Sequence, residues 1–272
     1  QWKLLGGLRY DYFKGRYWQT ALPAAGPNPA SPASTRERSD GVWSKRLGLL
    51  YQPSETQSYH AAWGTSFNTS GDTYQYDPLG ANTPPESSEN FEVGARFDSA
   101  DKRFTTRVAA FYAIKKNERN HVPDNGAVAY LLSGKRHAAG LEFDFAGRIT
   151  PRWEVFASYA FIPWAKIDRG APSTAQSLSG ELQGQRPSLT PRHSGTVWTT
   201  YAVTPQWRLG AGLTFRSKQS PNRNPGWDAK GFVTADLMAE YTVNDLVSLK
   251  FTVSIVTNRP SAAALYTGHY TP

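Results

Sequence analysis

Residues 233–241 read Val-Thr-Ala-Asp-Leu-Met-Ala-Glu-Tyr, and residues 247–255 read Val-Ser-Leu-Lys-Phe-Thr-Val-Ser-Ile. In both runs every second residue is apolar, while Asp236, Glu240 and Lys250 fall on the opposite face. Alternation with a period of two is typical of a β-strand that has one apolar face. Val243-Asn244-Asp245 lies between the runs as a tight turn, so this part of the sequence predicts a β-hairpin.

The same alternation recurs along the chain. Each run has apolar residues on one face and charged or polar residues on the other, and together the runs predict about eleven strands in an antiparallel sheet. The clearest runs begin at Trp2, Trp43, Tyr59, Phe91, Leu141 and Trp207. In a membrane barrel the apolar face meets lipid and the charged face lines the lumen.

The connections between these runs alternate strictly between short and long. Short turns are predicted at 52–56, 99–102, 150–152, 204–206 and 243–245, and long polar segments at 14–41, 70–88, 117–127, 166–185 and 219–230. Outer-membrane barrels have short turns on the periplasmic side and long loops outside. The sequence therefore predicts an all-β fold, a transmembrane antiparallel up-and-down β-barrel whose first strand runs outward.

Composition excludes several other classes. The chain has 272 residues with 9 Trp, 14 Tyr, 13 Phe, 23 Gly, 19 Pro and no Cys, a profile that favours strands and turns and removes thiolate chemistry. It has no apolar run long enough for a membrane helix and no signal peptide pattern. The net charge of +8 is spread without basic runs, which argues against nucleic-acid binding.

About eleven strands do not complete a bacterial barrel, because single-chain barrels of this kind have an even number of strands and leave no unpaired edge in lipid. We therefore expect residues 1–272 to be part of a longer chain.

Several motifs resemble TonB-dependent siderophore receptors, and within them most closely the ferric-catecholate group. The motifs are Arg46 to Pro53, Gly64 to Asn68, Thr83 to Glu86, Glu89 to Arg96, Gly147 to Trp153, Arg186 to Ser194 and Ala264 to Pro272. The resemblance implies a barrel of about 22 strands filled by an amino-terminal plug. It makes residues 1–272 a partial barrel that lacks the plug domain, the first barrel half and the closing strand. The sequence departs from the family at Ile255 and at Pro260-Ser261, which leaves the register of the last strand open.

A receptor for an anionic, aromatic ferric catecholate would offer cations for charge and aromatic rings for stacking. We take the candidate ligand-binding residues from the predicted outer loops, where any single residue is more often a solvated loop residue. The set is Arg16, Tyr17, Trp18, Arg36, Arg38, Tyr74, Tyr76, Lys116, Arg119, Arg223 and Trp227.

Catalytic and metal sites are not predicted. Charged pairs such as Arg9 with Asp11 and Arg96 with Glu92 follow from the polar lumenal face, and the five histidines lack the spacing of a metal site. No intrinsic cofactor is expected, because the siderophore itself carries the iron.

The resemblance implies a bacterial outer-membrane receptor that binds a ferric siderophore and imports it with energy from the TonB complex, which it contacts through a missing amino-terminal region. Outer-membrane lipid and lipopolysaccharide are the other expected partners, nucleic acid is not, and the full-length protein is expected to be a monomer. A passive porin is the main alternative, and a secreted all-β enzyme or lectin is a third. An upstream plug domain would exclude the porin, and solubility without detergent would favour the third class.

Overall fold

The computed structural model describes residues 1–21, 23–24, 30, 32–68, 84–124, 127–170, 182–220 and 228–254, with the side chains of residue 36 and of residues 119–124 and 127–133 left undescribed. Among these residues, no helix is long and apolar enough to cross a membrane.

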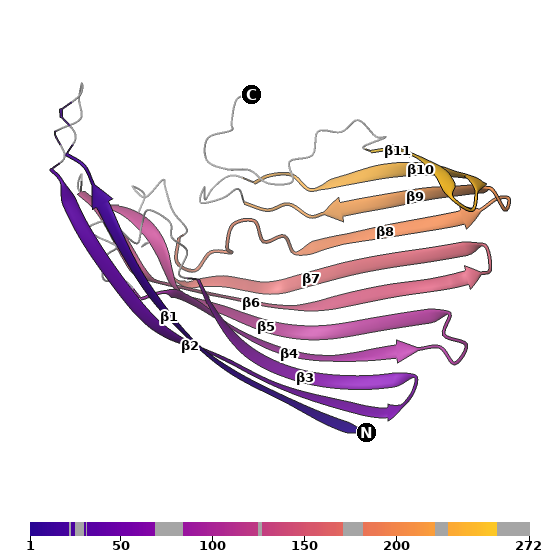
Figure 1. The fold of residues 1–272 in the computed structure, drawn as a ribbon, viewed down its shortest axis with the longest axis horizontal. Helices are drawn as coiled ribbons and strands as arrows, with labels where there is room; N and C mark the ends of the chain where they lie inside the picture. Colours follow the sequence, from indigo (N-terminus) through magenta and orange to yellow (C-terminus); the bar gives the residue numbers. More distant parts are fainter. Residues whose placement is uncertain are drawn as a thin grey trace.

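The described residues form one antiparallel sheet in which the strands follow the order of the sequence (Figure 1). Each strand pairs with the next, as in β1 and β2, whose register runs without interruption from Trp2 opposite Tyr51 to Gln19 opposite Ser34. This arrangement confirms the predicted all-β, up-and-down fold with eleven strands. The strands are β1 Trp2–Gln19, β2 Ser34–Ser54, β3 Gln57–Asn68, β4 Glu86–Asp98, β5 Phe104–Asp124, β6 Ala127–Thr150, β7 Trp153–Arg169, β8 His193–Ala202, β9 Trp207–Arg216, β10 Phe232–Asn244 and β11 Val247–Val253.

The five predicted tight turns all lie at one edge of the sheet, which we call the tight-turn end (right in Figure 1). The turn between β4 and β5 shows how side chains fix such a turn: Asp101 accepts hydrogen bonds from Ser99 Oγ, 2.5 Å away, and from the backbone N–H and Nε–H of Arg103. These bonds, led by that from Ser99, lower the pKa of Asp101 from 3.8 to about 2.

At the opposite edge of the sheet, which we call the long-connection end, the structure differs from the sequence prediction. Residues 14–19 and 34–41, predicted as loop, are strand in β1 and β2. The predicted loop 117–127 is almost entirely strand, because only residues 125 and 126 separate β5 from β6. A strand ladder needs only backbone partners, so it continues where the apolar alternation has ended.

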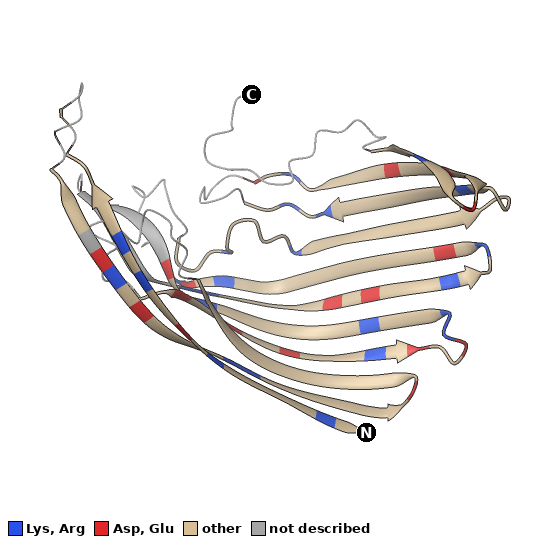
Figure 2. Cartoon of the chain, in the orientation of Figure 1, with Lys and Arg blue, Asp and Glu red and all other residues tan. Residues whose placement is uncertain are grey.

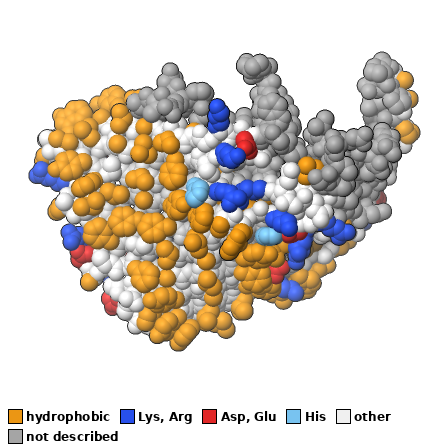
Figure 3. Space-filling view, turned by 180° about the vertical axis from the view of Figure 1, so that it is seen from behind, with side chains coloured by type: hydrophobic (Ala, Val, Ile, Leu, Met, Phe, Trp, Pro, Cys, Tyr) orange, Lys and Arg blue, Asp and Glu red, His pale blue; other side chains and the backbone are white. Residues whose placement is uncertain are grey.

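The two faces of the sheet differ as the alternation predicts. Large apolar side chains are exposed on every strand, while Ile167, Ala229 and Met238 are the buried apolar residues of the described part. Figure 3 shows the exposed apolar side chains gathered over the part of one face nearer the tight-turn end. Figure 2 shows acidic and basic residues following one another on β1 and β2 near the long-connection end. The sheet is a single layer whose apolar surface faces outward.

Candidate ligand-binding surface

The predicted binding residues lie on strands more than on loops. Arg16, Tyr17 and Trp18 are in β1, Arg38 is in β2 and Lys116 is in β5, as are the backbones of Arg36 in β2 and Arg119 in β5. Tyr74, Tyr76, Arg223 and Trp227 lie outside the described residues. The prediction that these residues are in loops is therefore wrong for all seven that the structure places, because the ladders of β1, β2 and β5 extend past the apolar segments.

The structure separates the three β1 candidates. The uninterrupted register with β2 puts Arg16 and Trp18 on the face of Leu4 and Leu8, and Tyr17 on the other. The guanidinium of Arg16 lies 5.9 Å from the centre of the Trp18 ring and forms an ion pair with Glu37. Arg16 and Trp18 therefore contact each other on the outward face and do not point into the lumen with Tyr17.

The other described cations of the set also have carboxylate partners. Arg38, whose side chain is 8% exposed, pairs with Asp40, and Lys116 Nζ lies 3.1 Å from Glu89. Glu89 accepts a second hydrogen bond from Trp63 Nε1 at 2.9 Å. Because each charge is compensated locally, these cations offer less attraction to an anionic ligand than the sequence alone suggests.

A buried charged network near the long-connection end was not predicted. Glu118 is 7% exposed and receives the guanidinium of Arg136 from β6 and Lys115 Nζ at 3.3 Å. Lys115 also reaches Glu86 of β4 at 3.0 Å. Asn117 has a φ of 58° at the register shift that brings Glu118 under these cations. The network ties three strands together where their apolar pairs have ended.

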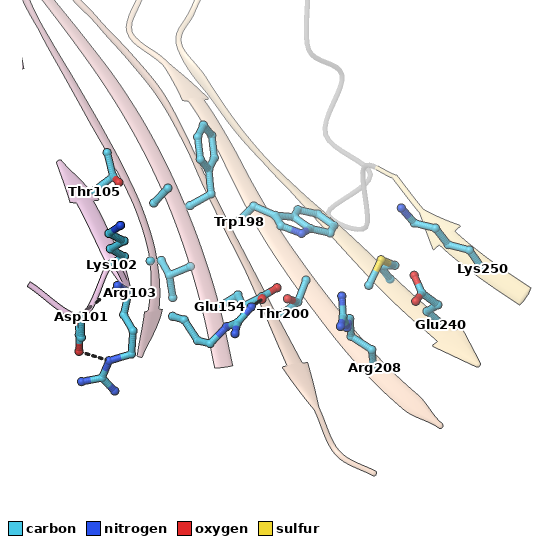
Figure 4. A pocket seen from close by; sticks show the side chains of 16 residues that line it. Asp101, Lys102, Arg103, Thr105, Glu154, Trp198, Thr200, Arg208, Glu240 and Lys250 are labelled. Carbon is cyan, nitrogen blue, oxygen red and sulfur yellow. Dashed lines mark hydrogen bonds and ion pairs between the residues drawn. The ribbon is translucent and has the colours of Figure 1, made fainter. Parts of the chain in front are cut away.

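The inner face carries a basin at the tight-turn end (Figure 4) with a volume of about 690 Å³. Trp198 lies over Gly212, where an added Cβ would come within 2.2 Å of the indole ring, and beside Gly210 and Met238. Figure 4 shows Arg208, Glu240 and Lys250 on the neighbouring strands of the same basin. The basin is lined both by the apolar side chains of Trp198 and Met238 and by the charged side chains of Arg208, Glu240 and Lys250.

Arg186 lies in the connection between β7 and β8, and its guanidinium is surrounded by backbone carbonyls. Its Nε donates to Thr190 O at 2.7 Å, and its Nη2 donates to Ile162 O at 2.6 Å and Pro191 O at 3.2 Å. Burial, and then the charge of nearby Arg192, lower the pKa of Arg186. In the sequence both residues stand out only as part of the motif Arg186 to Ser194. The absence of acidic residues from 182 to 227 is a sequence signal that could have found them, and the sequence prediction did not use it.

The charged pairs and histidines of the described residues have structural partners. Arg9 pairs with Asp11 at 2.6 Å as expected, whereas Arg96 pairs with Asp98 and not with Glu92, which is bonded to His60. In the part of the chain that the structure describes, no group of three His, Cys, Asp or Glu residues is arranged to hold a metal.

An up-and-down antiparallel sheet with tight turns at one edge and an apolar band on one face defines part of an outer-membrane β-barrel. The chain belongs to the TonB-dependent receptors, since residues 1–256 match the family described as TonB dependent receptor-like, beta-barrel. Members of this family are β-barrel proteins of the outer membrane.

Curated relatives extend the match across the chain. The probable TonB-dependent receptor BfrD of Bordetella pertussis is 32% identical over 99% of this chain and 36% of its own length. The probable TonB-dependent siderophore receptor PiuA of Acinetobacter baumannii is 27% identical over 99% of this chain and 36% of its own length. The catecholate siderophore receptor Fiu of Escherichia coli K12 is 26% identical over 89% of this chain and 34% of its own length. The chain thus spans about a third of these relatives, whose names describe receptors and not enzymes.

Solved structures share the fold. The crystal structure of the siderophore receptor PiuA from Acinetobacter baumannii superposes with a TM-score of 0.82 at 24% identity, over 99% of this chain and 38% of that one. The closed form of the ferric-catecholate import receptor Fiu from E. coli K12 gives a TM-score of 0.75 at 22% identity, over 97% of this chain and 39% of that one. The eleven strands therefore form one continuous segment of a larger barrel fold.

Proposed function

We propose that residues 1–272 are the carboxyl-terminal half of the barrel of a bacterial outer-membrane receptor that binds a ferric siderophore and imports it with energy from the TonB complex. The observation that carries the proposal is the family match over residues 1–256, together with relatives named as siderophore receptors. The plug, the first barrel half and the segment that contacts TonB belong to the proposed full-length protein.

A ferric catecholate is the ligand class that we favour. Such complexes are anionic and aromatic, and the chain has a net charge of +8 and 13% aromatic residues. One relative carries the name of a catecholate siderophore receptor. The ligand supplies the iron, so the receptor needs no cofactor of its own.

Outer-membrane lipid is the proposed partner of the outward apolar face, and lipopolysaccharide that of the cations beside it. Trp18, Trp43 and Trp164 are 65%, 53% and 71% exposed, as side chains at a membrane interface would be. The full-length protein is proposed to act as a monomer, because one barrel encloses one lumen.

Iron-limited growth tests this function. The full-length gene would be expressed in a strain that lacks its own catecholate receptors, and growth on a ferric catecholate as the sole iron source would be measured with and without TonB. The proposal predicts growth that requires both the gene and TonB. Uptake that persists without TonB would instead support a passive porin.

A further inference from the structure

The outward apolar face has a hollow of about 650 Å³ on β3 to β7. Its lining includes two rows of register partners, and residues that are partners across a ladder share one face of the sheet. Ala95 and Ala110 contribute short side chains to these rows, whereas Tyr59, Leu141 and Phe143 are large and exposed. An empty hollow loses the dispersion contacts of its walls, so on a lipid-facing surface it favours an apolar occupant.

A row of aromatic side chains borders the hollow on the side of the long-connection end. The register places Trp63 opposite Phe91, Phe91 opposite Tyr112, Tyr112 opposite Ala139 and Ala139 opposite Trp164. Aromatic rings in one row across several strands are typical of the membrane interface. Ala139 is the small member of this row, so the row has an opening on β6, which also lines the hollow.

The next row toward the long-connection end carries charge. His137 lies opposite Lys166, and Nδ1 of His137 is 2.9 Å from a carboxylate oxygen of Asp168. Lys166 is exposed, and within the described chain its ammonium group forms no ion pair. Figure 3 shows basic and histidine side chains where the apolar side chains end toward the long-connection end. Lys166 is therefore a cation without a counter-ion in the described chain, one row beyond the opening at Ala139.

A second cation on the same face is already compensated. Lys116 lies on β5 opposite Ser87, and its ammonium group shares Glu89 with the indole N–H of Trp63. The register thus places Lys116 on the outward face, although the sequence predicts it as a siderophore ligand. Because Glu89 offsets the charge of Lys116, Lys166 offers the stronger attraction to an anion.

We propose that the outward face of β3 to β7 binds one lipopolysaccharide molecule, with an acyl chain in the hollow and a phosphate group on Lys166. The acyl chain reaches the phosphate through the opening at Ala139. Charge complementarity and the apolar hollow together require a lipid that carries both chains and phosphate. The site rests on the proposed function, which places the long-connection end at the outer side of the membrane, and it names the residues that hold the lipid there.

The phosphate contact is tested with the full-length receptor in detergent, after removal of its lipid. Two probes are titrated at equilibrium: lipid A, the acylated and phosphorylated part of lipopolysaccharide, and the same glycolipid without its phosphates. Lys166→Gln should weaken lipid A binding about tenfold, as expected for the loss of one charge-assisted hydrogen bond, and leave the dephosphorylated probe unchanged. Lys3→Gln is the matched control, because Lys3 is exposed on the opposite face of the sheet, and it should change neither affinity.

The hollow is tested by filling it. Ala110→Phe should weaken binding of both probes roughly tenfold, because it displaces about two methylene groups of the acyl chain from apolar contact. Ala211→Phe is the control for this change. Ala211 is exposed on the apolar face of β9, between Leu209 and Leu213 and outside the hollow, so its replacement should leave both affinities unchanged.

Three results would overturn the site. One is lipid A binding that survives Lys166→Gln or Ala110→Phe at full strength. Another is phosphatidylglycerol binding as tightly as lipid A with the same two losses, which would assign the face to ordinary phospholipid. The third is self-association of the receptor in detergent that Ala110→Phe abolishes, because a second copy would then cover the hollow.

The proposed function fails by a different measurement. TonB-dependent growth on a ferric catecholate tests import and does not depend on lipid A titration. Absent growth with intact lipid A binding would overturn the import function and leave the lipid site in place. Normal growth with lipid A binding that both variants leave unchanged would do the reverse.

Discussion

The two ends of the sheet are stabilised by different forces. At the tight-turn end, strands alternate apolar and polar residues, and short turns with bonded side chains such as Asp101 join them. At the long-connection end the apolar alternation has stopped, yet β1, β2, β5 and β6 remain paired and charges such as Glu118 are bonded across strands. The tight-turn end therefore has the alternating side-chain polarity that contact with lipid requires. The long-connection end is held together by backbone pairing and ion pairs.

Removing the buried carboxylate should have the largest effect on the long-connection end. Glu118→Gln leaves Arg136 and Lys115 without their shared partner, and we expect the free energy of unfolding to fall by about 3 kcal/mol. Denaturant titration of the folded receptor measures this. Glu37→Gln, which breaks the exposed pair with Arg16, should lower the free energy of unfolding by no more than about 1 kcal/mol. Equal losses would remove the distinction between buried and exposed pairs.

A charge on the outward face should show where the lipid-facing region ends. Leu213 lies on the apolar face of β9 and is 50% exposed, so Leu213→Arg is expected to cost about 2–4 kcal/mol if it lies near the bilayer centre. Trp18→Arg, on the outward face of β1 near the long-connection end, should cost about 0–1 kcal/mol. The comparison is made by reversible unfolding in lipid vesicles. Similar penalties at both positions would mean that the extensions of β1 and β2 also contact the membrane core.

Filling a glycine under Trp198 should disturb the tight-turn end. Gly212→Ala would place a Cβ 2.2 Å from the Trp198 ring, so the indole must move, at a cost of about 1–3 kcal/mol. Thermal unfolding and tryptophan fluorescence would report the change. Gly6→Ala has no neighbour within 4 Å and should be neutral or slightly stabilising. A neutral Gly212→Ala would show that Trp198 does not pack there.

The smallest effect concerns the β4–β5 turn. Asp101 has its pKa lowered to about 2, so its hydrogen bonds stabilise the turn above the unfolded pKa near 3.8 and are lost as the pH falls through about 2. Titration of the Asp101 carboxyl group by NMR measures this. Ser99→Ala removes the strongest donor and should raise this pKa toward its ordinary value. An unchanged titration would contradict the hydrogen-bonded turn.

The candidate site could be predicted only in part. The sequence predicts Arg16, Arg38 and Lys116 as loop cations, but the structure places them on strands beside Glu37, Asp40 and Glu89. Compensation of Arg16 and of Lys116 depends on a residue of the neighbouring strand, and register is not visible in one strand alone, whereas Asp40 is only two residues from Arg38 on the same strand. The ligand-facing role of the predicted set stays a prediction.

The strands of the apolar region and the tight turns between them can be predicted from the amino-acid sequence alone, because both depend on near neighbours: alternation fixes a strand's faces, and turn residues fix its end. Asp101 with Ser99 and Arg103 is such a local case. How far the ladders extend, and which charged side chains find partners, depends on the folded sheet. Glu118 meets Arg136, and Arg186 meets the carbonyl of Ile162, through contacts between separate segments whose register only the folded sheet sets.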